Sequence, residues 1–498
     1  MSSLLSAFKK TINRQGTYYL LVVVLGFIPL FYNLGAPVLN HWDESRRAVN
    51  AYEMMQNGKL LVTYFNGEPE MWGTKPPLLI WFQALSFKVF GASEFALRFP
   101  VALSGMLLAL LILWFCGRYF KDHLLGLVSV LILYTTPAMV SVHSVRTGDF
   151  DLVLILFTTA AAFFMLLAGH VEEKRERDRW ILLFFAAFTL AALTKGIAPF
   201  LLAPGLLAYL LVSKGLLTWL RSRNFWIGTA MLVLLFGGYY LVRELLNPGY
   251  LRAVVENEMT GRYFETLEEN QASFHYYIRG IYQWRFKAWF YLVPLGVLLG
   301  YWKGDKRTTG FLNLSLLVTS LYLLVISLSE TKLEWYDLPV FPFLFMMAAL
   351  FFQMVIQGLT GEQGPVRIRW GKNLVAASLL LFFFMTPYYH TFKSNRSGDA
   401  FNQDETYRLS HYLREMHDRE GGGGTINIIH EGENAQQFLF YVYLLEEDGY
   451  DITISDPSGM SGGNTYLLHQ PGVVEKLKAA YPEMKPVRLS EGIYSIAF

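Results

Sequence analysis

Charged residues that could do chemistry are concentrated in one stretch near the N-terminus, residues 40–77, between strongly apolar segments. Asp43, Glu44 and Arg46 closely follow a hydrophobic run, and Lys75 stands directly before a Pro-Pro pair. Carboxylates and cations at a membrane edge suggest a site for a charged substrate, because ionisable groups there are costly and usually functional. A solvated loop with ordinary interfacial charges is the alternative interpretation.

The composition places these charges in a membrane protein. Of the 498 residues, 53% are hydrophobic and only 16% are charged, whereas a soluble globular protein has about 25% charged residues. The net charge of +2 argues against a nucleic-acid partner. The single cysteine, Cys116, excludes an internal disulfide. The first apolar run, 18–31, has a basic approach and no small-residue cleavage signal after it, so we expect a retained helix and not a signal peptide.

Apolar runs that could cross a bilayer recur up to about residue 390. A crossing takes about 20 residues, fewer when the helix is tilted or flanked by interfacial aromatic residues. We expect about eleven transmembrane helices, at residues 17–34, 97–117, 123–141, 150–169, 180–194, 196–213, 225–246, 287–303, 310–328, 335–356 and 372–388. The run 76–91 begins with two prolines, which suit a helix start. We expect this run to lie along the outer surface, with a full crossing as the alternative.

The distribution of Lys and Arg orients these helices. Connections rich in basic residues belong on the cytoplasmic side. If 76–91 does not cross, all such connections fall on the side of the N-terminus: 117–123, 170–180, 213–224, 301–310 and 363–373. The external side then collects the remaining charged loops: 35–96, 143–151, 193–196, 247–286 and 329–336.

Acids and cations therefore gather on the external face. Asp149 and Asp151 stand at the start of an apolar helix, and we expect them near Asp43 and Glu44. The cations on this face break the positive-inside trend; they are Lys75, Arg146, Lys195, Arg262 and Lys332. Each cation alone would be expected to extend its charge to the lipid headgroups. Together, beside several acids, they favour a shared anionic ligand.

From about residue 390 the composition becomes that of a soluble domain. Helical spacing over 404–418 ends at a glycine run, 421–424, and helical segments near 434–446 and 472–481 follow. Short β-like runs alternate with them, at 425–430, 451–455, 465–469 and the end of the chain. We predict a membrane domain over residues 1–390 and a small external α/β domain over residues 391–498. The latter carries no phosphate-binding glycine motif, metal-ligand spacing or nucleophile elbow.

The external charges fit a reaction centre. A carboxylate can accept a proton from a hydroxyl as a general base, and cations facing it can stabilise a phosphate as it leaves. A donor made of sugar, phosphate and a long lipid needs both parts and an apolar groove. A membrane transporter is one alternative, but its polar groups would be expected near the bilayer midplane. A flippase or lipid-binding scaffold with the same groove and no catalysis is the other.

An ordered set of motifs resembles a known family. The motifs are DESR (43–46), Gly67 followed by KPPL (75–78), FGASEFALR (90–98), SVRTGDFDLVL (144–154), LTKG (193–196), ENEMTGRYF (256–264) and S-x-x-K-L-x-x-Y-x-L-P (329–339). Together they resemble the GT-C glycosyltransferases of the family that contains protein O-mannosyltransferases and the bacterial aminoarabinose transferase acting on lipid A. The resemblance spans most of residues 17–345. It implies a GT-C fold: an α-helical polytopic membrane protein with surface helices.

The resemblance also implies a reaction. It is the inverting transfer of a sugar from a polyprenyl phosphate to an acceptor hydroxyl or phosphate. Asp43 matches the family's first-loop acid and is our candidate base, with Glu44 and Asp149 as further catalytic candidates. The expected contacts to substrate or lipid phosphate are Arg46, Lys75, Lys195, Arg262, Lys332 and Tyr336. Asp151, Glu258 and His275 complete the candidate set.

A departure from the family pattern leads us to predict no metal, and we expect no other cofactor. The aminoarabinose transferase has Glu, in contact with a metal, where this chain has Thr74; a divalent cation stays an alternative that the sequence does not indicate. The expected partners are a polyprenyl-phosphate-linked sugar, the lipid bilayer and an acceptor glycolipid, glycan or protein. Among acceptors, lipid A, a surface glycan and a protein Ser or Thr stay open, and we favour an envelope glycolipid or polysaccharide. The expected location is the bacterial inner membrane, multi-pass, with the site on the periplasmic face.

Overall fold

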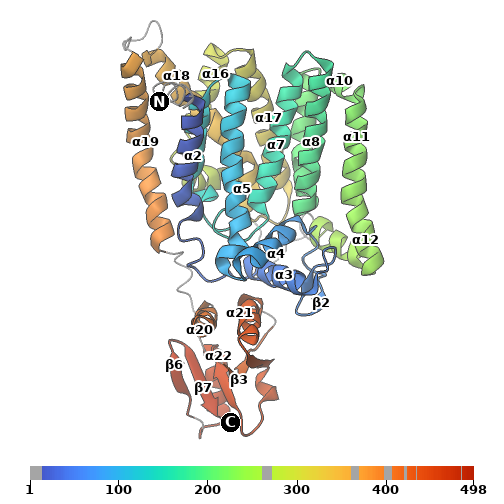
Figure 1. Ribbon diagram of the computed structural model, residues 1–498, viewed down its shortest axis with the longest axis vertical. Helices are drawn as coiled ribbons and strands as arrows, with labels where there is room; N and C mark the ends of the chain where they lie inside the picture. The colour runs from blue at the N-terminus through green and yellow to red at the C-terminus, as the bar shows by residue number, and fades with distance from the viewer. Residues whose placement is uncertain are drawn as a thin grey trace, which may run out of the picture.

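The computed structural model describes residues 14–260, 272–360, 369–397, 407–419, 423–432, 435–483 and 485–497. A bundle of long helices forms one part, and a small domain of helices and strands forms the other (Figure 1). The main helices of the bundle are α2 (Arg14–Phe31), α5 (Glu94–Phe115), α6 (His123–Tyr134), α7 (Asp151–His170), α8 (Lys174–Lys195), α9 (Ala203–Val212), α11 (Arg223–Leu232), α12 (Gly238–Leu246), α16 (Leu292–Lys303), α17 (Lys306–Leu328), α18 (Phe341–Thr360) and α19 (Arg369–Ser397).

Each apolar run predicted from the sequence coincides with a helix or with consecutive helical segments. Within the described ranges, six helices are long and apolar enough to cross a membrane: Glu94–Phe120, Asp151–His170, Arg223–Leu246, Lys306–Leu328, Glu334–Leu359 and Leu374–Arg396. Shorter apolar helices accompany them, at Gln15–Phe31, Leu78–Phe90, His123–Tyr134, Ala198–Val212 and Leu292–Lys303. The helical membrane architecture is thus confirmed, and the number of about eleven crossings stays a prediction.

Local sequence signals set several helix ends. The Asp122 carboxylate accepts hydrogen bonds from the amides of Leu124 and Leu125 and starts α6. Gly58, with φ of 68°, ends α3 (Asp43–Asn57), because glycine adopts this left-handed conformation at little cost. The helices then pack through apolar side chains; the rings of Phe115 and Phe163, for example, stack 3.8 Å apart between α5 and α7.

Two helices lie across one end of the bundle instead of running along it. They are α3 and α4 (Leu78–Phe90), and Figure 1 shows them between the bundle and the small domain. This orientation of α4 is the one expected for a helix on the membrane surface. The short helix α10 (Leu216–Leu220), in a basic connection predicted to be cytoplasmic, lies at the opposite end of the bundle (Figure 1).

The small domain contains a five-stranded mixed sheet. Its strands are β3 (Gly424–Ile429), β4 (Tyr450–Ser455), β5 (Thr465–Leu468), β6 (Val487–Ser490) and β7 (Ile493–Ala497). Their order is β4-β3-β5-β7-β6; β3 pairs in parallel with β4 and β5, and β7 pairs antiparallel with both β5 and β6. The helices of this domain are α20 (Arg408–His417), α21 (Gln436–Glu447) and α22 (Pro471–Ala480). The predicted α/β character is confirmed. The predicted domain boundary at residue 390 falls inside α19, which continues to Ser397.

Helix α21 joins the small domain to the surface helices. Its Tyr443 ring stacks on Tyr52 of α3 at 5.2 Å, and its Phe440 ring stacks on Phe87 of α4 at 5.7 Å. The helix is buried over most of its length. The segment between α2 and α3 is therefore enclosed by the bundle on one side and the small domain on the other.

Candidate active site

Helix α3 presents Asp43 as its first residue, directly after a strained turn. Trp42 has φ of 68° and ψ of −87°, and the Asp43 amide donates to the His41 carbonyl at 3.1 Å. This is a γ-turn of the rare type whose central residue has positive φ, a conformation unfavourable for a side chain such as tryptophan. Asp43 Oδ1 accepts a hydrogen bond from Arg47 Nη2 at 2.8 Å, and the Asp43 side chain keeps 31% of its surface exposed.

The second acid, Asp149, lies in the loop before α7 and is nearly enclosed. Its Oδ2 accepts a hydrogen bond from Thr147 Oγ1 at 2.6 Å and pairs with His143 Nδ1 at 3.2 Å. Burial alone would raise the pKa of the Asp149 carboxyl, but the adjacent His143 outweighs it and holds the pKa below its usual range. Burial would likewise lower the pKa of His143, and the negative charge of Asp149 raises it above the ordinary histidine value.

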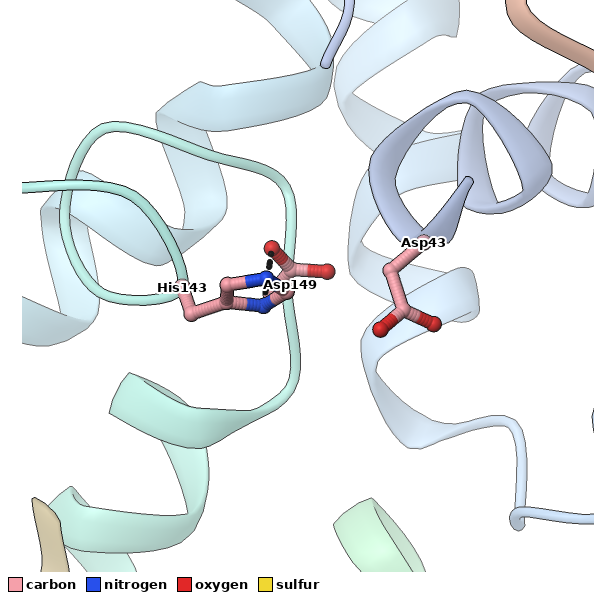
Figure 2. Close-up of side chains that lie close together, drawn as sticks. All are labelled: Asp43, His143 and Asp149. Atoms are coloured by element: carbon pink, nitrogen blue, oxygen red, sulfur yellow. Dashed lines mark ion pairs between the residues drawn. The ribbon is translucent and has the colours of Figure 1, made fainter. Parts of the chain in front are cut away.

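The two acids face each other across a small gap. Figure 2 shows Asp43 on one side and the His143–Asp149 pair on the other, approached from α3 and from the loop before α7. One ligand atom from each of Asp43, His143 and Asp149 lies within 4.8 Å of the other two. The predicted proximity of the first-loop and second-loop acids is therefore present in the structure.

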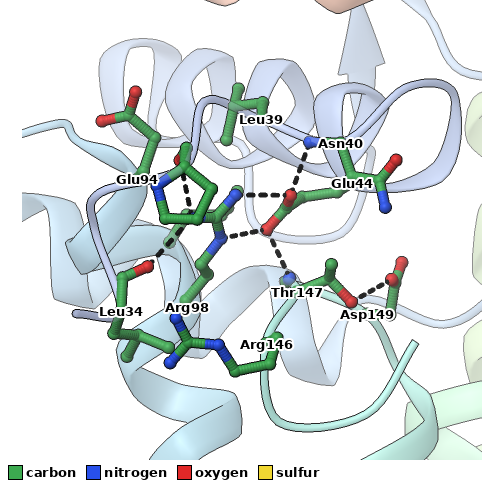
Figure 3. Close-up of polar contacts among 12 residues, drawn as sticks. Leu34, Leu39, Asn40, Glu44, Glu94, Arg98, Arg146, Thr147 and Asp149 are labelled. Atoms are coloured by element: carbon green, nitrogen blue, oxygen red, sulfur yellow. Dashed lines mark hydrogen bonds and ion pairs between the residues drawn. The ribbon is translucent and has the colours of Figure 1, made fainter. Parts of the chain in front are cut away.

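Glu44, the neighbour of Asp43 in sequence, points away from this gap and is buried. Its two oxygens accept from Arg98 Nε and Nη2 at 2.6 and 2.8 Å (Figure 3). They also accept from the amides of Asn40 at 2.7 Å and Gly148 at 2.8 Å. Arg98 donates in addition to the carbonyls of residues 34, 37 and 38. Glu44 thus connects the first loop, α5 and the loop that carries Asp149.

Arg46 takes part in the organisation of the first loop. Its Nε and Nη2 donate to the Glu70 carboxylate at 2.8 and 2.9 Å, and its guanidinium lies over the Phe65 ring. Burial opposes ionisation of Glu70, but Arg46 and the amides of Trp72 and Gly73 hold the pKa of Glu70 below its usual value. The contacts of Arg46 therefore tie α3 to the segment just before Lys75.

A pocket with a charged end and an apolar body opens beside the acid pair. Lys75, Lys195, Asp151, Glu258 and Tyr336 line the charged end. Lys75 Nζ lies 3.0 Å from Glu258 Oε1, and Lys195 Nζ lies 2.5 Å from Asp151 Oδ1. The body is lined by Leu154, Ile197, Ala198, Leu201, Tyr322, Val325, Ile326 and Pro339. A long apolar molecule with an anionic end matches this lining.

Two segments of the chain supply neighbouring residues to both places. At the start of α7, Asp149 of the preceding loop faces Asp43, and Asp151, the first residue of the helix, lines the pocket. In the 3₁₀ helix η7 (Glu334–Val340), Trp335 stacks on His143 at 3.5 Å and Tyr336 lines the pocket. The acid pair and the pocket are therefore parts of one site.

Comparisons with known proteins agree with this geometry. Residues 74–240 match the family model described as dolichyl-phosphate-mannose-protein mannosyltransferase. An undecaprenyl phosphate-alpha-4-amino-4-deoxy-L-arabinose arabinosyl transferase from Edwardsiella ictaluri is 28% identical over 70% of this chain and 61% of its own length. The corresponding protein of Aeromonas salmonicida is 31% identical, over 65% of this chain and 58% of its own length. The chain thus spans about three fifths of the length of these relatives.

A solved structure extends the likeness to nearly the whole chain. ArnT from Cupriavidus metallidurans, in a crystal structure with bound undecaprenyl phosphate, superposes with a TM-score of 0.71 at 16% identity. The superposition covers 96% of this chain and 97% of that one, so the shared fold includes the small domain. The chain is thus similar in sequence to the aminoarabinose transferases and shares the fold of ArnT. The site residues predicted from the sequence do not all gather in one place.

Seven of the twelve predicted residues lie at the acid pair or the pocket, and the other five are placed as follows. Lys332 is buried and donates to the carbonyl of Ser329, itself a pocket residue, at 2.5 Å. His275 is exposed and precedes α15 (Tyr276–Gly280), where its ring meets Phe274. Arg262 lies outside the described residues. Arg46 and Glu44 have the loop-organising contacts given above.

Two residues with clear positions in the site were not predicted from the sequence. His143 pairs with Asp149, and a single histidine near the end of an apolar run gives no distinctive signal. Arg98 was quoted within a motif, but its role depends on Glu44, 54 positions earlier in the chain. Because Glu44 and Arg98 are ionisable residues in an otherwise apolar environment, a search for complementary charges at the ends of apolar runs could have found the pair.

Asp43, Asp149 and His143 together offer the kinds of ligand atom found at metal sites. Carboxylate oxygens and an imidazole nitrogen suit several divalent metals. Asp43 already pairs with Arg47, however, and Asp149 pairs with His143. A cation would have to replace these contacts, so the residues present favour a site that is neutralised by protein cations. Thr74, the residue that replaces the family's Glu, donates to Glu258 at 3.2 Å.

Proposed function

We propose that this protein transfers a sugar from a polyprenyl-phosphate donor to an acceptor on the periplasmic face of a bacterial inner membrane. The acceptor oxygen attacks the anomeric carbon as the bond to the phosphate oxygen breaks on the opposite face. The sugar configuration inverts, and polyprenyl phosphate leaves. Asp43 takes the acceptor proton as a general base.

One observation carries this proposal: the acid pair and a pocket for an anionic lipid share the same two segments. Asp149 and Asp151 are two residues apart, and Trp335 and Tyr336 are adjacent. A phosphate bound at Lys75 and Lys195 would therefore hold the attached sugar beside the acids. A transporter or flippase needs the pocket but has no need of a base at its mouth.

The lysines of the pocket are placed to add a phosphate to their present contacts when the donor binds. Each is held by a carboxylate, Lys75 by Glu258 and Lys195 by Asp151, and both are largely buried. A phosphate brings further acceptor oxygens and negative charge, so each lysine can contact both its carboxylate and the phosphate. The same charges stabilise the polyprenyl phosphate that leaves.

The structure distinguishes the three carboxylates by exposure and hydrogen bonding. Asp43 is partly exposed, whereas Asp149 is nearly enclosed and Oδ2 of its carboxylate is held by Thr147 and His143. Glu44 is buried and fully bonded to Arg98 and two amides. We therefore assign the base to Asp43, orientation of the sugar or acceptor to Asp149, and positioning to Glu44.

For the acceptor we favour an envelope glycolipid over a soluble glycan or a protein. An apolar groove lies between α4, α5 and α7, lined among others by Phe82, Val89, Phe99 and Leu156. Gln83 of α4, beside this groove, donates to the carbonyl of Gly148, the residue before Asp149. An acyl chain in the groove would bring a lipid headgroup close to the acids.

The experiment that tests the proposal has two parts. The purified protein is incubated with undecaprenyl-phosphate sugars and extracted envelope lipids, and free undecaprenyl phosphate and modified lipid are measured by mass spectrometry. Envelope lipids of a deletion strain identify the natural product. Transfer with inverted configuration, shown by NMR, supports the enzyme. Binding of the donor with no product from any acceptor, together with sugar-lipid movement across vesicles, would establish the flippase instead.

A further inference from the structure

We propose that the small C-terminal domain is a positioning element of the active site, because two of its tyrosines hold the strained turn that aims Asp43. The residues are Tyr407, just before α20, and Tyr441, in α21. This inference rests on the proposed function of Asp43 as the base. The inference gives the C-terminal domain a direct part in orienting Asp43, although Tyr407 and Tyr441 follow Asp43 by 364 or more positions in the sequence.

Tyr441 contacts the segment before the turn with both functions of its hydroxyl. The Leu39 amide donates to the Tyr441 oxygen at 2.9 Å, and the hydroxyl donates to Glu94 Oε1 at 2.8 Å. Leu39 and Tyr441 are completely buried, so no water replaces this contact. Glu94 is in the first turn of α5, the helix that also carries Arg98. Tyr441 thus joins the turn segment to the helix that holds Glu44.

Tyr407 repeats the same arrangement two residues further on. The His41 amide donates to the Tyr407 oxygen at 3.1 Å, and the hydroxyl donates to Asn40 Oδ1 at 3.0 Å. Tyr407 is 5% exposed and therefore fixed by its surroundings. Two tyrosines from one domain thus accept hydrogen bonds from alternate amides of residues 39–41.

Four backbone amides within residues 39–43 have a partner that fixes the chain around the turn. Leu39 has Tyr441, Asn40 has Glu44, His41 has Tyr407, and Asp43 has the His41 carbonyl of the γ-turn. A residue in an unfavourable backbone conformation persists only where its surroundings fix it from several directions. For Trp42, the C-terminal domain supplies part of this fixation through Tyr407 and Tyr441.

The domain is itself held firmly against the same segment. Arg414 of α20 donates to the Ala36 carbonyl at 2.8 Å and lies 3.3 Å from Glu94. The stacked rings of Phe440 and Phe87 fix α21 against α4. A shift of the domain would therefore move residues 36–41 and change the direction of Asp43, while the lysines of the pocket would keep their contacts.

The test compares three conservative variants of the full-length protein: Tyr407→Phe, Tyr441→Phe and, as a control, Tyr443→Phe. Tyr443 lies on α21 in the same interface and donates to Glu53 of α3 at 2.8 Å, away from the turn. The measurements are kcat and the donor KM, binding of undecaprenyl phosphate, and hydrogen exchange of the amides of residues 39–43.

We expect Tyr407→Phe and Tyr441→Phe to lower kcat about ten- to a hundred-fold, the range produced by a displaced catalytic group. The donor KM and undecaprenyl phosphate binding should change less than about threefold, because the pocket is intact. Amide exchange over residues 39–43 should accelerate at least about tenfold in these two variants. Tyr443→Phe should match the parent in every measurement.

The proposal is overturned if Tyr407→Phe and Tyr441→Phe keep the parent's kcat and amide exchange. It is also overturned if Tyr443→Phe loses as much activity as they do, because the effect would then be general loosening of the interface. If the parent itself transfers no sugar, the proposed function fails separately. In that case unchanged exchange over residues 39–43 still refutes the positioning role, and faster exchange supports the contacts that define it.

Discussion

Replacement of Arg98 by methionine tests whether Glu44 positions the site or takes part in the chemistry. Methionine fills much of the same space but removes every hydrogen bond of the guanidinium. Glu44 would then be a buried carboxylate without a cation, and the carbonyls of residues 34, 37 and 38 would lose their donor. The first loop would lose its connection to α5 and to the loop before α7.

The magnitude follows from the burial of this ion pair. The side chains of Arg98 and Glu44 are 2% and 0% exposed, and removing one partner of such a pair costs about 3–5 kcal/mol. At about 2 °C per kcal/mol, a value suited to a large domain, the unfolding midpoint should fall by about 6–10 °C. Adding Glu44→Gln should recover part of the loss, because no charge is then left buried.

The assay is thermal unfolding in detergent with turnover measured in parallel. Arg118→Met is the matched control, because Arg118 pairs with Glu176 at 2.7 Å with both side chains at least a third exposed. Such a pair contributes about 1 kcal/mol or less. If Arg98→Met unfolds within about 2 °C of the parent and keeps its turnover, the structural role assigned to Glu44 is wrong.

Three further predictions concern the pocket and the acid pair. Lys195→Met should weaken undecaprenyl phosphate binding by about ten- to a hundred-fold, since a charge-assisted hydrogen bond contributes about 1.5–3 kcal/mol. Isothermal titration measures this affinity, and an unchanged value would show that the phosphate binds elsewhere. Thr147→Val removes a hydrogen bond to Asp149 and should lower kcat by about tenfold, with the KM for the sugar donor unchanged. A change in this KM alone would contradict the role assigned to Asp149. Turnover should survive a chelator, because His143 and an arginine already neutralise the acids, and activity lost to the chelator and restored by Mn²⁺ would show a metal requirement.

The positions of the helices, and the side of the bundle on which each charged loop lies, were predictable because both depend on local sequence. Long apolar runs must form helices in a bilayer, and the strands of the small domain follow short β-branched runs. The same logic placed Asp43 and Asp149 on one face. Because both residues were assigned to the same side of the membrane, they were predicted to lie close to each other.

The directions in which the side chains of neighbouring residues point were not predictable in this way. Asp43 and Glu44 are adjacent, but successive residues of a helix point about 100° apart. Asp43 therefore faces Asp149 and His143, and Glu44 faces Arg98. Asp149 and Asp151 also separate, because α7 begins at Asp151 and turns this side chain toward Lys195.

The role of the C-terminal domain was hidden for another reason. Tyr441 contacts Leu39 across 402 positions of sequence, and no local pattern reports a contact of that separation. The positive φ of Trp42 was not predictable from the sequence either. The residues usually found at positive φ are glycine and asparagine, and this position has tryptophan.

Turnover of Asp43→Asn, measured together with donor binding, tests the central claim most directly. Asparagine keeps the shape of the side chain and removes the proton acceptor. We expect turnover of a defined undecaprenyl-phosphate sugar to fall about a hundred- to ten-thousand-fold, while binding of the same donor is retained. Asp149→Asn is measured alongside. If Asp43→Asn turns over like the parent while Asp149→Asn is inactive, the second loop supplies the base and the assignment of Asp43 is contradicted.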